Sequence, residues 1–207
     1  MADLTVPFFL ARPAVDPPWP GVIVIHEGNG ISPQLLRVCE RLAAEGYAAI
    51  APDLYFRSGG SEAADFAMLI GALHRDEVLA DVADARAQLA ALGATRVGIT
   101  GFCLGGSISY RAALSDLDID ATVSFYGGHI AHELGEPHCP VLLFFGGHDE
   151  YIPPQDLDAV RAHHPDAVVV YPDAGHGFAR DGSPSYDEAA GRDAWDRLLS
   201  FFAQHLR

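Results

Sequence analysis

The sequence predicts an α/β fold, with a mostly parallel central sheet and helices on both faces. Short segments rich in Val, Ile and aromatic residues alternate along the chain with longer amphipathic segments. Each short segment is apolar on consecutive residues, which indicates a strand covered on both faces, as in a parallel sheet. Strands that alternate with helices form such sheets through right-handed crossovers. The predicted strands are residues 21–26, 47–52, 96–100, 121–127, 141–147 and 167–172.

The amphipathic segments supply the helices of this fold. Ser32 and Pro33 are the residue types of an N-cap and a first helical position, so a helix is predicted over 34–46. A short edge strand is predicted over 4–10, before a proline-rich surface loop. The other predicted helices are residues 62–74, 75–93, 104–114, 153–164 and 185–206.

Length and composition indicate a single domain over residues 1–207, with a minimal cap domain or none. The chain has 207 residues, of which 49% are hydrophobic, enough for one sizeable core and too few for two. We expect no transmembrane helix and no signal peptide, because there is no long uncharged apolar stretch and no basic leader. Three cysteines, an odd and sparse count, argue against a disulfide framework and favour a cytoplasmic protein.

The charge of the chain argues against two classes of partner. A formal net charge of −15 creates a field that repels nucleic acid and anionic membrane surfaces. The histidines and cysteines lack the spacing of a zinc site, so neither a metal nor a cofactor is predicted. A small molecule remains as the expected partner. The chain has no heptad repeat or obvious apolar patch, which favours a monomer.

Reactive side chains follow four of the predicted strands. The loops are HEGNG from His26, GFCLGG from Gly101, GGHDEY from Gly146 and DAGHGFAR from Asp173. In parallel sheets, ligands bind beyond the carboxyl ends of the strands, where these loops lie. A cysteine, then an aspartate, then a histidine therefore each follow the carboxyl end of a strand, in the chain order of an α/β-hydrolase, which is the fold we predict.

The segment GFCLGG has the glycine spacing of a nucleophile elbow, with Cys103 at its centre. A strand that turns sharply into a helix strains its central residue, so the neighbours Gly101 and Gly105 must lack bulk. Gly106 lets the helix pack near the strand. The helix N-terminus beneath Cys103 favours a thiolate nucleophile. The alternative is a small buried cysteine, the interpretation that we give to Cys39 and Cys139.

A thiol nucleophile needs a base, an acid that orients the base, and donors for the oxyanion. His176 is the candidate base and Asp149 the candidate acid; their rivals are His148 and Glu150. His148 adjoins Asp149 in the chain, where the two side chains tend to diverge. The backbone N–H of Leu104 is one expected oxyanion donor. The second is expected from the HEG turn, at Gly28.

The segments HEGNG, APDLYFR, GFCLGG, GGHDEYIP and AGHGFAR together resemble the dienelactone hydrolase family of α/β-hydrolases. The resemblance spans about residues 20–205. It implies hydrolysis of an ester or lactone through a Cys-His-Asp triad, Cys103, His176 and Asp149 here. The typical activity of the family opens carboxymethylenebutenolide (dienelactone) to maleylacetate.

The resemblance also implies roles for four further residues. Glu27 matches a glutamate that accepts a hydrogen bond from the resting thiol. Arg57 and Arg180 match two arginines that hold the substrate carboxylate, and Tyr126 matches an aromatic residue that lines the pocket. Glu27 could instead be a solvated loop residue, and each arginine could pair with one of the many surface aspartates.

The sequence departs from the family pattern in ways that leave the substrate open. Gly177 stands where some family members have a serine that helps to bind the carboxylate, and residues 58–77 lack an expected tryptophan. A general carboxylesterase or thioesterase without a carboxylate requirement is therefore an alternative. A non-catalytic α/β-hydrolase scaffold that binds a small molecule is another. A redox-sensing thiol is less favoured, because no resolving cysteine lies near Cys103.

Overall fold

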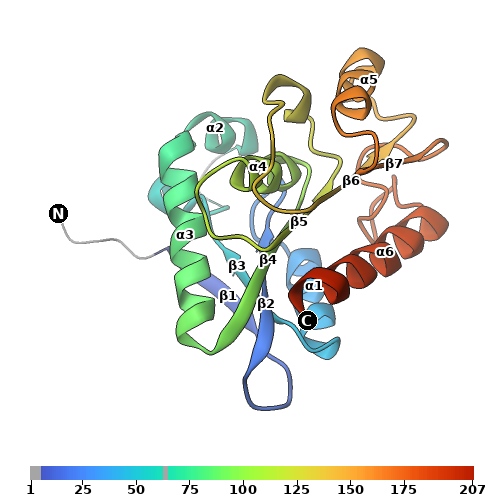
Figure 1. Ribbon diagram of the computed structural model, residues 1–207. Coiled ribbons are helices and arrows are strands. Elements are labelled where there is room, and N and C mark those ends of the chain that lie inside the picture. Colours follow the sequence, from blue (N-terminus) through green and yellow to red (C-terminus); the bar gives the residue numbers. More distant parts are fainter. Residues whose placement is uncertain (1–5, 63–64) are drawn as a thin grey trace.

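The computed structural model describes residues 6–62 and 65–207. One seven-stranded sheet runs through it in the order β1-β3-β2-β4-β5-β6-β7 (Figure 1). Strand β1 pairs antiparallel with β3, and the other neighbouring strands are parallel. The strands are β1 (Phe8–Ala11), β2 (Trp19–Ile25), β3 (Ala48–Pro52), β4 (Ala94–Phe102), β5 (Ala121–Phe125), β6 (Val141–Gly146) and β7 (Val168–Tyr171).

Six helices and two 3₁₀ turns connect these strands within the described residues. The helices are α1 (Pro33–Ala44), α2 (Phe66–Gly71), α3 (Arg75–Ala91), α4 (Leu104–Ala113), α5 (Pro154–His163) and α6 (Glu188–Leu206). The 3₁₀ turns are η1 (Phe56–Ser58) and η2 (Ile130–His132). No helix in the ranges that the structure covers is long and apolar enough to span a membrane.

Two hydrophobic cores lie on opposite faces of the sheet, because successive strand residues point to opposite sides. Val22 and Val24 of β2 belong to the core that α1 and α6 cover. Ile23 and Ile25 belong to the core that α3 and α4 cover. Figure 1 shows these two helix layers with the sheet between them. The prediction of a mostly parallel sheet with helices on both faces is confirmed.

Most element boundaries agree with the sequence, and the differences have local causes. The Ser32 hydroxyl caps α1 by accepting from the Leu35 N–H at 3.2 Å, as its residue type predicts. Helix α2 is shorter than the predicted helix 62–74. Its start is set by Asp65, whose carboxylate accepts a hydrogen bond from the Ala67 N–H and so caps the helix. Residues 63–64 of that prediction, and 4–5 of the predicted edge strand, lie outside the described residues.

Candidate active site

Cys103 sits at the junction of β4 and α4 with a strained backbone. Its φ of 55° and ψ of −113° fall outside the regions that residues with a side chain normally adopt. The sharp turn requires a glycine at position 101, because a Cβ atom on Gly101 would lie 2.2 Å from the carbonyl oxygen of Gly105. Only glycine therefore fits at that position. The geometry is that of the predicted nucleophile elbow.

The start of α4 is wedged between the ends of two strands. A Cβ atom on Gly105 would lie 2.4 Å from the carbonyl oxygen of Ile25, at the end of β2. One on Gly106 would lie 2.5 Å from the carbonyl oxygen of Phe125, at the end of β5. The two glycines thus bring the helix N-terminus, and Cys103 with it, to the carboxyl edge of the sheet.

Asp149 and His176 are joined by a hydrogen bond of 2.8 Å between Oδ2 and Nδ1. The other oxygen of Asp149 accepts from the Tyr151 N–H at 2.9 Å, which fixes the carboxylate. The Asp149 side chain is only 1% exposed. The rivals His148 and Glu150 are both exposed. This arrangement has an acid that orients a base, with Nε2 of the imidazole left for another partner.

His176 interacts with both other residues of the predicted triad. Burial disfavours its charged form, but the hydrogen bond with Asp149 and the influence of the Cys103 sulfur outweigh burial and raise the pKa of His176 to about 9. The rings of Tyr126 and Tyr151 each lie 4.9 Å from the imidazole, centroid to centroid. The structure therefore brings Cys103, His176 and Asp149 together in one cluster, as the chain order predicts.

Glu27 lies in the same cluster and has two polar neighbours. The Tyr126 hydroxyl donates to its Oε1 at 3.4 Å, and the Arg180 Nε lies 3.4 Å from its Oε2. Burial raises the pKa of Glu27, while Arg180, His176 and Tyr126 act in the opposite direction. Tyr126 is fully buried and has a positive φ of 40°, a second strained residue at the site.

Arg57 has a carboxylate partner of its own, Asp81. Its two terminal nitrogens donate to the two oxygens of Asp81, at 2.6 and 2.8 Å. Asp81 lies on α3 and its side chain is 4% exposed, whereas that of Arg57 is 32% exposed. The guanidinium also stacks on the Phe56 ring, 4.3 Å from its centroid. Arg57 thus pairs with an aspartate, which is the alternative that the sequence left open.

The two N–H groups predicted as oxyanion donors belong to Leu104 and Gly28. The Leu104 N–H is the first of α4 and has no partner within the helix. Gly28 lies in the turn after β2, where the Ile70 and Phe66 side chains of α2 approach it. Neither N–H donates to an acceptor among the residues that the structure describes. Both are therefore available for an oxyanion.

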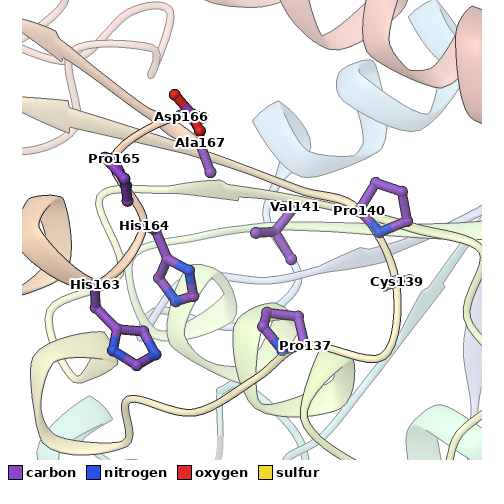
Figure 2. Close-up of a pocket in the computed structure, with 9 residues that line it drawn as sticks. All are labelled: Pro137, Cys139, Pro140, Val141, His163, His164, Pro165, Asp166 and Ala167. Atoms are coloured by element: carbon purple, nitrogen blue, oxygen red, sulfur yellow. The ribbon is translucent and has the colours of Figure 1, made fainter.

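A hollow of about 400 Å³ lies at the amino ends of the strands, opposite the end of the sheet that carries the triad residues (Figure 2). Val141 begins β6 and Ala167 precedes β7, so this hollow is at the amino ends of those strands. The triad residues follow the carboxyl ends. The hollow is therefore not the catalytic pocket, although a cysteine and two histidines line it. Its lining comprises Pro137, Cys139, Pro140, Val141, His163, His164, Pro165, Asp166 and Ala167.

Sequence reasoning missed three side chains around the cluster. The Tyr151 ring lies against His176, and the residue is 74% exposed. His26 and Tyr55 are buried beside the turn that carries Glu27. Tyr151 could have been noticed as the second residue after Asp149. His26 and Tyr55 carried no signal beyond their places after β2 and β3.

A parallel sheet with a strained cysteine at the start of a helix, and an aspartate–histidine pair beside it, defines an α/β-hydrolase. The chain belongs to the dienelactone hydrolase family, whose model matches residues 6–206. The family makes the protein a carboxylic ester hydrolase, as the sequence predicts.

Sequence and structure relatives agree with this assignment. A Salmonella typhimurium protein named "Putative carboxymethylenebutenolidase" is 38% identical, over 97% of this chain and 83% of its own length. An Escherichia coli protein of the same name is 36% identical over the same shares. A solved structure named "Putative Dienelactone Hydrolase", from Klebsiella pneumoniae, has a TM-score of 0.87 and 35% identity, over 97% of this chain and 93% of its own. The dienelactone hydrolase-like promiscuous phosphotriesterase P91 has a TM-score of 0.74 and 26% identity, covering 92% and 88%.

Proposed function

We propose that the protein hydrolyses small esters or lactones with Cys103 as nucleophile, and that carboxymethylenebutenolide-type lactones bearing a carboxylate are its substrates. In this proposal the chain acts as one domain and as a monomer, in the cytoplasm. The observation that carries the proposal is the strained Cys103 at the start of α4, together with a histidine that Asp149 orients and whose pKa responds to Cys103. The names of the bacterial relatives support the lactone substrate.

The first half of the reaction forms a thioester. His176 takes the proton of the Cys103 thiol, and the sulfur attacks the carbonyl carbon of the substrate. The carbonyl electrons move to oxygen, and the oxyanion accepts hydrogen bonds from the Leu104 and Gly28 N–H groups. When the tetrahedral intermediate collapses, the alkoxide leaves and takes the proton from His176. In a lactone, this leaving oxygen stays attached to the acyl group.

The second half releases the product. His176 removes a proton from a water molecule, whose oxygen attacks the thioester carbonyl. A second oxyanion forms at the same two N–H groups and collapses, with the Cys103 sulfur as leaving group. The thiolate regains its proton from His176. The net reaction adds one water across the ester bond.

Arg180 and Arg57 are the proposed partners of the substrate carboxylate. A guanidinium can hold a carboxylate by two charge-assisted hydrogen bonds. Arg180 is 41% exposed and adjoins Glu27, whereas Arg57 must first leave Asp81. Arg180 is therefore the better placed of the two for this role.

A general carboxylesterase is the second candidate function. It is favoured by the fact that both arginines already have carboxylate partners. The test is a panel of p-nitrophenyl esters and carboxylated lactones, run with the wild type and with Cys103→Ala, Arg57→Ala and Arg180→Ala. Loss of all turnover in Cys103→Ala is expected, and undiminished turnover would contradict the nucleophile. A higher KM in the arginine variants for carboxylated lactones alone supports the lactone proposal. Arginine variants with the same kinetics as the wild type on these lactones favour the general esterase.

A further inference from the structure

The peptide group between Glu27 and Gly28 carries the N–H that serves as the second oxyanion donor in the proposed mechanism. It lies in a turn closed by a hydrogen bond of 3.0 Å from the Gly30 N–H to the Glu27 carbonyl oxygen. Two side chains that are 0% exposed, His26 and Tyr55, lie against this turn. Their rings are 4.8 Å apart, centroid to centroid. Neither side chain takes part in the proposed proton transfers.

The hydrogen bonds of His26 define its protonation. Its Nε2 accepts from the Leu54 N–H at 3.2 Å, so this nitrogen carries no proton. Burial lowers the pKa of His26, which keeps the ring neutral. The single ring proton is therefore on Nδ1, which lies 2.7 Å from the Glu27 carbonyl oxygen and donates to it.

This bond fixes the direction of the Gly28 N–H. A peptide group is planar and trans, so its C=O and N–H point in opposite directions. The Glu27 oxygen is held by His26 and Gly30, and the Gly28 N–H must then point away from both. Donors on a carbonyl also polarise the amide and strengthen its N–H as a donor. His26 thereby acts on orientation and on donor strength together.

Tyr55 fixes the next peptide group along the chain. Its hydroxyl donates to the Gly28 carbonyl oxygen at 2.8 Å, and burial raises the pKa of Tyr55, which keeps the hydroxyl protonated. On the other side, a Cβ on Gly105 would lie 2.7 Å from the His26 carbonyl oxygen, so the strand end abuts the start of α4. The turn is thus held against the elbow from both directions.

We propose that His26 and Tyr55 are positioning residues for the Gly28 N–H as an oxyanion donor: His26 orients and polarises its peptide group, and Tyr55 holds the next peptide group in place. This inference rests on the proposed function. Removing an oxyanion donor outright lowers kcat by roughly 10²–10³-fold. Loosening its support should cost less, and the loss should fall on kcat rather than on KM, because the oxyanion exists only after attack.

The test compares Tyr55→Phe with Tyr110→Phe. Both variants delete the hydrogen-bonded hydroxyl of a buried tyrosine, since the Tyr110 hydroxyl lies 2.7 Å from His164 Nε2 and 3.3 Å from the Gly135 carbonyl oxygen, away from the triad. With p-nitrophenyl acetate, Tyr55→Phe should lower kcat about tenfold, a fraction of the cost of a lost donor, and leave KM within about twofold. Tyr110→Phe should change neither. Equal effects in the two variants, or an unchanged kcat in Tyr55→Phe, would overturn the inference.

The ratio of turnover between an oxygen ester and its thionoester is a measurement that a purely structural role of Tyr55 would leave unchanged. Sulfur is a poor hydrogen-bond acceptor, so p-nitrophenyl thionoacetate gains little from the oxyanion donors. Tyr55→Phe should therefore reduce the preference for the oxygen ester, whereas Tyr110→Phe should preserve it. His26→Asn, which keeps a donor near the position of Nδ1, should retain more of this preference than His26→Leu. A preference unchanged in Tyr55→Phe contradicts the inference.

A spectroscopic measurement separates this inference from the proposed function. The Gly28 amide signal should shift and exchange faster with solvent in Tyr55→Phe than in Tyr110→Phe. If the wild type cleaved no ester, the proposed function would fail, and the Gly28 signal would still decide the positioning. If the wild type cleaved esters and the Gly28 signal were the same in both variants, the positioning role alone would fail.

Discussion

The Arg180 Nε lies 3.4 Å from Glu27 Oε2, so the arginine proposed to hold the substrate carboxylate already has a carboxylate partner. Glu27 is the residue that the family resemblance assigns to the resting thiol. A carboxylated substrate would therefore compete with Glu27 for Arg180. Any substrate that draws Arg180 away leaves Glu27 with Tyr126 as its remaining polar contact among the described side chains. Substrate binding and the charge beside the thiol are coupled through this pair.

Glu27→Gln should lower the KM for a carboxylated lactone. The expected factor is roughly two to five, because a partly exposed ion pair is worth about 0.5–1 kcal/mol. The KM for p-nitrophenyl acetate should not change, since this ester has no carboxylate. Alkylation of Cys103 by iodoacetamide should become faster, because a nearby negative charge disfavours a second one on sulfur. Glu150→Gln, at an exposed position, is the control, and the same KM in both variants would contradict the coupling.

Arg57→Ala should destabilise the fold, because it leaves the buried Asp81 carboxylate without its two donors. We expect a loss of roughly 1–3 kcal/mol in the free energy of unfolding, the cost of an unsatisfied buried group. The control is Arg192→Ala, whose partner Glu188 and own side chain are both about 70% exposed. That variant should lose less than about 0.5 kcal/mol. Urea denaturation measures the free energy of unfolding of both variants. Equal losses would show that the Arg57–Asp81 pair stabilises the fold no more than an exposed ion pair does.

The proximity of the three candidate catalytic residues could be predicted, because chain order and strand ends suffice to bring them together. Cys103, Asp149 and His176 each follow a strand of one parallel sheet, and the carboxyl ends of such strands meet at one edge. The pairing of Arg57 could not be predicted in the same way. Asp81 is one of 28 acidic residues, and its contact depends on how α3 is rotated against the sheet.

The roles of His26 and Tyr55 were also beyond reach of the sequence. The sequence places both residues after strands, but a hydrogen bond to a particular carbonyl depends on side-chain direction and on the path of each loop. The two loops are 28 residues apart in the contact between His26 and Leu54. The position of Gly101 was easier to predict, because it is required by one local turn whose geometry is known.

Cys103→Gly should be more stable than Cys103→Ala, although both remove the nucleophile. A φ of 55° with a ψ of −113° is costly for any residue with a Cβ and nearly free for glycine. The expected difference is about 1 kcal/mol or more in the free energy of unfolding, measured by urea denaturation. Val123→Gly against Val123→Ala, in the middle of β5, is the control and should give the opposite order. Equal stability of the two Cys103 variants would mean that the elbow stores no strain.

His176 should titrate with a pKa of about 9, followed by NMR of its imidazole. Burial alone would lower the pKa, and the hydrogen bond with Asp149 and the influence of the Cys103 sulfur supply the increase. Asp149→Asn should therefore lower the pKa of His176, and Cys103→Ala should lower it as well, because each removes one of these contributions. A wild-type value near 6.5, or one unchanged in both variants, would contradict this account.

The same pKa predicts how stability depends on pH. The folded-state pKa of His176 exceeds the unfolded value of 6.5, so folding favours the protonated ring. Its stabilisation is fully present below pH 6.5 and is lost as the pH rises through about 9. The difference in unfolding free energy between the wild type and His176→Gln should shrink over this range, by at most about 3 kcal/mol. A difference that stays constant from pH 6 to pH 9.5 would mean that His176 binds its proton equally well in the folded and unfolded chains.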